Sequence, residues 1–162
     1  MSILFNADEV LAVAVRIEQN GARFYRRAAE AAGSDRLRDF FLGLATFELS
    51  HEHTFTELRK KLGERERTAT VFDPEHESAG YLKALADARV YDVEADPVKK
   101  LSGRESVKEI LAFALGMEKD SIIFYLGIRD LVPAGLGKEK IDEIIREEMR
   151  HITILNREMA GG

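Results

Sequence analysis

The second half of this sequence repeats the first at an offset of 100 residues. The repeat needs no gap, and its identical pairs include charged and aromatic residues: Glu9, Leu11, Ala12, Ala14, Glu18, Phe24, Tyr25, Glu48 and His51 recur as Glu109, Leu111, Ala112, Ala114, Glu118, Phe124, Tyr125, Glu148 and His151. Unrelated stretches of about 50 residues would share only about three or four identities. The chain is therefore predicted to contain two copies of one structural unit.

Each copy is predicted to be a helical hairpin. Strand-type alternation is absent, and four long segments have helical apolar spacing, at about 7–33, 35–62, 105–132 and 138–159. The expected N-caps are Asn6 for the first segment, Ser34 or Asp35 for the second, and Ser102 or Ser106 for the third. Short joints within each pair favour antiparallel neighbours. We expect an all-α, antiparallel four-helix bundle.

The two hairpins are joined by a long connection, residues 63–104. This segment is long enough to cross the bundle, and its spacing predicts a short helix around 78–90. We expect it to pack on the bundle, so that residues 1–162 form a single domain.

Each long segment carries polar residues within its inward-facing apolar stripe. In the second segment the stripe runs Leu37, Phe41, Leu44, Glu48, His51, Phe55, Leu58 and Leu62. The first and third segments place Glu18 and Glu118 in their stripes, and the fourth places Glu148 and His151. Four carboxylates converging in an apolar core would repel one another and lose hydration, and the stripes supply no Lys or Arg to compensate.

A pair of divalent cations would offset this cost, because four carboxylates neutralise two such ions. A Glu-x-x-His motif places both side chains one turn apart on one helical face, and the motif occurs twice. Ligation dominated by carboxylates, with one imidazole per metal, favours iron or manganese over structural zinc. The sequence contains no cysteine, which excludes a Cys-ligated zinc or iron–sulfur site within it.

These motifs resemble those of the ferritin-like di-iron carboxylate proteins, and of the rubrerythrin-type family in particular. The resemblance is carried by RIEQNGARFYRRAAE, LATFELSHEHTF, GMEKDSIIFY and IIREEMRHITIL and covers nearly the whole chain outside 63–104. It implies a ferritin-like fold with two bound iron ions, with manganese or zinc as substitutes. The implied metal ligands are Glu18, Glu48, His51, Glu118, Glu148 and His151, and Tyr25 and Tyr125 resemble tyrosines that hold ligand carboxylates.

Two departures from the family bear on activity. Rubrerythrins usually carry a further carboxylate one turn after the third-helix glutamate, where this chain has Ser121. They also carry a Cys-ligated, rubredoxin-like electron-entry module, which a sequence without cysteine lacks. The resemblance therefore implies an oxidoreductase that reduces peroxide or dioxygen with electrons from an external donor. Ferroxidation with iron storage or delivery is an alternative, and a metal-free helical scaffold is another.

The remaining features predict the setting of this chemistry. A net charge of −5 argues against nucleic acid or an acidic membrane as the main partner, and the absence of a membrane span or secretory signal favours a cytoplasmic protein. Apolar residues beside the stripes, such as Phe40, Phe47, Ile122 and Ile123, favour a homodimer. Off the stripes, His53, His76, Glu52 and Glu147 are interpreted as surface residues.

Overall fold

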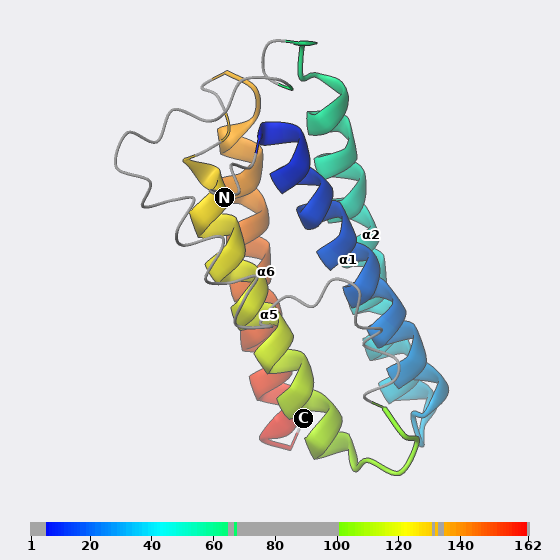
Figure 1. Ribbon diagram of the computed structural model, residues 1–162. Coiled ribbons are helices and arrows are strands. Elements are labelled where there is room, and N and C mark those ends of the chain that lie inside the picture. Colours follow the sequence, from blue (N-terminus) through cyan, green and yellow to red (C-terminus); the bar gives the residue numbers. More distant parts are fainter. Residues whose placement is uncertain (1–5, 65–66, 68–100, 131, 133–134, 162) are drawn as a thin grey trace, which may run out of the picture.

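The computed structural model describes residues 6–64, 67, 101–130, 132 and 135–161. Within them the chain forms four long helices and no strand, which confirms the all-α prediction. The helices are α1 (Ala7–Glu30), α2 (Asp35–Lys60), α5 (Val107–Arg129) and α6 (Lys138–Met159). Figure 1 shows two helical hairpins, α1 with α2 and α5 with α6, lying side by side as a four-helix bundle.

The repeat is visible in how the two hairpins begin. The Asn6 side chain caps α1 by accepting from the Glu9 amide at 2.9 Å, and the Glu9 carboxylate accepts in return from the Asn6 amide. Ser106 and Glu109 form the same reciprocal pair at the start of α5. The repetition of glutamate at positions 9 and 109 is thus explained by helix capping. Of the candidate N-caps for the second and third segments, the structure selects Ser34 and Ser106.

Three of the predicted helices extend slightly too far at their C-terminal ends. The structure ends α1 at Glu30, α2 at Lys60 and α5 at Arg129. The apolar stripe continues past these ends, because Leu62 and Val132 remain buried although they lie outside the helices. The spacing therefore indicated burial correctly and helix length less well.

The core consists of two apolar clusters, one towards each end of the bundle. One cluster gathers the N-terminal half of α1, the C-terminal halves of α2 and α5, and the N-terminal half of α6. The other gathers the opposite halves of the same helices. Between the two clusters lies a polar layer with six buried charged or histidine side chains: Glu18, Glu48, His51, Glu118, Glu148 and His151.

Most of the connection between the hairpins lies outside the described residues. The predicted short helix at 78–90, the path of the connection and His76 all fall there. The single-domain assignment over residues 1–162 therefore stays a prediction. None of the described helices is long and apolar enough to span a membrane.

Candidate metal centre

The structure brings all six predicted ligand residues together at the middle of the bundle. Each is at most 5% exposed. Their side-chain donor atoms form two overlapping groups in which all atoms lie within 4.8 Å of one another. One group is Glu18, Glu48, His51 and Glu148, and the other is Glu48, Glu118, Glu148 and His151. Glu48 and Glu148 belong to both groups.

Both histidines face the cluster through Nδ1. In His51 this atom lies 3.0 Å from Oε1 of Glu148 and 3.4 Å from Oε2 of Glu18. In His151 it lies 3.1 Å from Oε2 of Glu148 and 3.5 Å from Oε2 of Glu118. The two imidazole rings are nearly parallel, with centroids 5.7 Å apart. Glu148 therefore lies between the histidines and contacts both.

Tyr25 and Tyr125 hold carboxylates of the opposite hairpin. The Tyr25 hydroxyl donates to Oε1 of Glu118, and the Tyr125 hydroxyl donates to Oε1 of Glu18. Burial raises the pKa of both phenols well above the usual value, so both remain protonated donors. The two hydrogen bonds connect the hairpins and fix the orientation of one carboxylate on each side of the cluster.

The four carboxyl groups differ strongly in acidity although their positions repeat. Burial and the nearby charge of Glu148 raise the pKa of Glu48 well above its usual value and that of Glu118 to about 8. Burial also acts to raise the pKa of Glu148, but the contacts of its carboxylate with Glu118, His151 and His51 outweigh burial and lower that pKa. In the metal-free protein the charged form is therefore favoured for Glu148, and the protonated form is favoured for Glu48 and Glu118.

Several buried polar atoms in the cluster have no hydrogen-bond partner. They are Oε2 of Glu18, Oε1 of Glu48, Nδ1 of His51 and Oε1 of Glu148. Unpaired buried oxygen and nitrogen atoms cost free energy, and here they face one another rather than solvent. Two divalent cations would both satisfy these atoms and cancel the charge of four ionised carboxylates. The donor set therefore fits a pair of metal ions.

Sequence reasoning missed one residue that belongs to this site, Glu147. It was interpreted as a surface charge, but its Oε2 lies 2.6 Å from Nε2 of His51, and its side chain is only 38% exposed. The available signal was a mismatch in the repeat, since position 47 holds phenylalanine where position 147 holds glutamate. Glu52 is half-buried and accepts from Gln19, whereas His53 is exposed as predicted.

Ser121 contributes no donor to the cluster. Its hydroxyl donates to the backbone carbonyl of Met117 at 3.0 Å, within its own helix. Its partner in the repeat, Gly21, has a clearer role, because a Cβ at this position would lie 2.5 Å from Oε2 of Glu48. The absence of a side chain at Gly21 allows the Glu48 carboxylate to lie against α1.

Replacing Gly21 with alanine is expected to separate metal binding from folding. The added methyl group displaces the flexible end of Glu48 and weakens metal binding about tenfold. Alanine also favours the helix by about 1 kcal/mol, so the metal-free protein keeps its stability. Gly116→Ala is the matched control, because nothing lies within 4 Å of its added Cβ. Equal Fe(II) affinity in the two variants, measured by anaerobic equilibrium dialysis, would contradict this role for Gly21.

The metal-free protein is expected to lose stability as pH rises. Burial acts to lower the pKa of His151, but Glu118 and Glu148 outweigh it and raise that pKa to about 9. The pKa of Glu118 is raised as well, to about 8. A group whose pKa is higher in the folded state stabilises the folded protein fully at pH values below its unfolded-state pKa. This stabilisation is lost as the pH rises through its folded-state pKa. The Tm of chelator-treated protein should therefore decrease as the pH is raised from about 6 to about 9 at constant ionic strength. An increase in Tm across this range would show that the cluster does not retain these protons.

Comparisons with known proteins agree with this geometry. A sequence model of the rubrerythrin family matches residues 9–101, which is more than half of the chain. A crystal structure from Thermotoga maritima, assigned as a ferritin-like diiron-carboxylate protein, is similar with a TM-score of 0.76 and 25% sequence identity. That similarity covers 97% of this chain and 96% of the other, so it includes both hairpins. No curated protein sequence matches significantly.

Proposed function

This chain belongs to the rubrerythrin family, and we propose that it is a non-haem di-iron oxidoreductase that reduces peroxide or dioxygen with electrons from a separate donor. The observation that carries this proposal is the buried cluster of four glutamates and two histidines whose unpaired donor atoms face one another. Similarity to a ferritin-like diiron-carboxylate structure supports iron as the metal.

In this proposal each overlapping group of side chains would hold one iron ion. Glu18 and His51 would serve one ion and Glu118 and His151 the other, and Glu48 and Glu148 would contribute to both groups. When bound, the two ions supply one electron each, which matches the two-electron reduction of peroxide to water.

The surrounding residues orient the ligands and limit access of water. Tyr25 and Tyr125 hold the carboxylates of Glu118 and Glu18 by hydrogen bonds. Phe41 packs on the Tyr25 ring at a centroid distance of 6.4 Å, and Phe55 packs on Tyr125 at 5.0 Å. These aromatic pairs belong to the two apolar clusters on either side of the polar layer, so they would limit access of water from the two ends of the bundle.

The partners form part of the same proposal. The sequence contains no cysteine to ligate an iron–sulfur or rubredoxin-like centre, so the electrons would come from a donor outside these 162 residues. A second copy of the chain is the other proposed partner, because Phe47 and Ile123 are 48% and 42% exposed and a homodimer would cover such side chains.

Anaerobic stopped-flow spectroscopy tests the proposed activity. Protein loaded with Fe(II) should be oxidised by peroxide or dioxygen faster than free Fe(II) in the same buffer, and a chemical reductant should restore it for repeated cycles. Oxidation no faster than that of free iron would contradict the proposal. Uptake of far more than about two irons per chain would instead favour the alternative of iron storage.

A further inference from the structure

The two halves of the candidate centre are related by the repeat but differ in one contact. Glu147 on α6 lies against His51 on α2, with Oε2 at 2.6 Å from Nε2. The repeat-related pair is Phe47 on α2 and His151 on α6, whose rings pack with centroids 5.2 Å apart. Each histidine thus contacts the residue at the same place on the opposite hairpin, but only His51 meets a carboxylate there.

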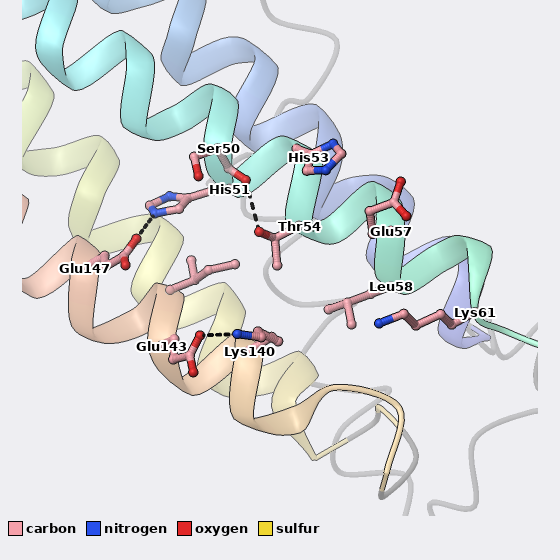
Figure 2. Close-up of a pocket in the computed structure, with 11 residues that line it drawn as sticks. Ser50, His51, His53, Thr54, Glu57, Leu58, Lys61, Lys140, Glu143 and Glu147 are labelled. Atoms are coloured by element: carbon pink, nitrogen blue, oxygen red, sulfur yellow. Dashed lines mark hydrogen bonds and ion pairs between the residues drawn. The ribbon is translucent and has the colours of Figure 1, made fainter.

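This difference extends to the surface between α2 and α6. A cleft of about 350 Å³ opens beside His51 and is lined from α6 by Lys140, Glu143, Ile144 and Glu147. Figure 2 shows Glu147 pointing from α6 towards His51 at this cleft. The residues related to Lys140, Glu143 and Glu147 by the repeat are Phe40, Gly43 and Phe47. The His51 side is therefore lined by charged residues of α6 at an open cleft, whereas His151 packs against the Phe47 ring.

The geometry determines what Glu147 can do for His51. Nδ1 of His51 faces the cluster, at 3.0 Å from Glu148 and 3.4 Å from Glu18, so Nε2 is the nitrogen left for an outer partner. A carboxylate that accepts the Nε2–H hydrogen bond fixes the proton on that nitrogen and directs the lone pair of Nδ1 to the cluster. It also fixes the ring orientation and makes the imidazole a stronger donor. Phe47 offers His151 packing but no acceptor.

We propose that Glu147 is a positioning residue for His51, and that it makes the metal position served by His51 the tighter of the two. The proposal rests on the proposed di-iron function, since it concerns how the same cluster holds its ions. It predicts that the two ions bind in sequence, the first to the group containing Glu18 and His51. Outer partners of metal-ligating histidines typically change metal affinity by about 10–100-fold, which sets the expected difference.

The test is anaerobic equilibrium dialysis with Fe(II), together with visible absorption titrations with Co(II), on wild type and on variants at position 147. Wild type should give two separable dissociation constants. Glu147→Ala should weaken the tighter one by about 10–100-fold and leave the other unchanged. Glu147→Gln, whose amide oxygen can still accept from Nε2–H, should recover part of the loss, which removal of mere packing would not explain.

Two further variants strengthen the test. Glu143→Ala removes another carboxylate from the same cleft and should leave both constants at wild-type values. Phe47→Glu places a carboxylate beside His151 and should tighten the weaker site about tenfold. Both changes are at partly exposed positions, so the fold should tolerate them.

The possible outcomes distinguish failure of the proposed role of Glu147 from failure of the proposed di-iron function. Two ions bound by wild type, with unchanged constants and Co(II) spectra in Glu147→Ala, would overturn the role of Glu147 and leave the di-iron function intact. Failure of folded wild type to bind either metal would overturn the proposed function, and the role of Glu147 with it.

Discussion

Replacing Glu48 with glutamine is expected to abolish the stabilisation of this protein by metal while leaving the metal-free fold unchanged. Burial and the charge of Glu148 raise the pKa of Glu48 well above its usual value, which favours its uncharged, protonated form in the metal-free protein. Glutamine has the same shape as the protonated acid and the same lack of charge. It cannot, however, provide the anionic oxygens that both metal positions require.

The size of this effect follows from linkage. A metal present at about 1,000 times its dissociation constant stabilises the folded state by about 4 kcal/mol, which corresponds to a Tm increase of about 10 °C for a chain of this length. Thermal unfolding with and without Fe(II) under anaerobic conditions should show this increase in wild type and in the control Glu57→Gln. Glu48→Gln should show no increase, and its metal-free Tm should match wild type. An increase of wild-type size in Glu48→Gln would exclude Glu48 as a shared ligand.

The same substitution at Glu148 is expected to have a different consequence. Glu148 lies at 3.0 Å from Nδ1 of His51 and 3.1 Å from Nδ1 of His151, and its pKa is lowered by these contacts and by Glu118. Glu148→Gln removes the anion between two buried imidazoles. Breaking a buried ionic interaction from one side costs about 3–5 kcal/mol, so the metal-free protein should be destabilised as well as unable to bind metal.

Urea unfolding of chelator-treated protein measures this difference. Glu48→Gln serves as the matched control, because it changes the same atoms at the repeat-related position. We expect a lower midpoint for Glu148→Gln than for wild type, and an unchanged midpoint for Glu48→Gln. Equal midpoints for the two variants would show that the two glutamates are equivalent in the metal-free protein, contrary to the structure.

Much of this architecture could be predicted from local sequence patterns. The caps Asn6 and Ser106 act through residues three positions away, and the apolar stripe depends only on helical periodicity. The polar residues within these stripes lie together because all four helices of a bundle turn their apolar stripes towards the same core. The stripes therefore predicted the six polar residues of the cluster, and the resemblance to the rubrerythrin-type family added the role of Tyr25 and Tyr125.

What could not be predicted depends on how the two hairpins are placed against each other. The contact of Glu147 with His51 requires the relative rotation and height of α2 and α6, which neither helix encodes alone. For the same reason the repeat gave no sign that Glu48 and Glu148 differ in pKa. That difference arises because only Glu148 lies between the two histidines.

The central claim, that the buried cluster is a two-metal site, is tested most directly by measuring metal per chain after anaerobic Fe(II) loading and desalting. The structure predicts about two iron ions per chain in wild type, from two groups of donors with two shared glutamates. It predicts that these ions are lost in Glu48→Gln and in Glu148→Gln. Folded wild-type protein that retains no iron, or iron that persists in both variants, would contradict the claim.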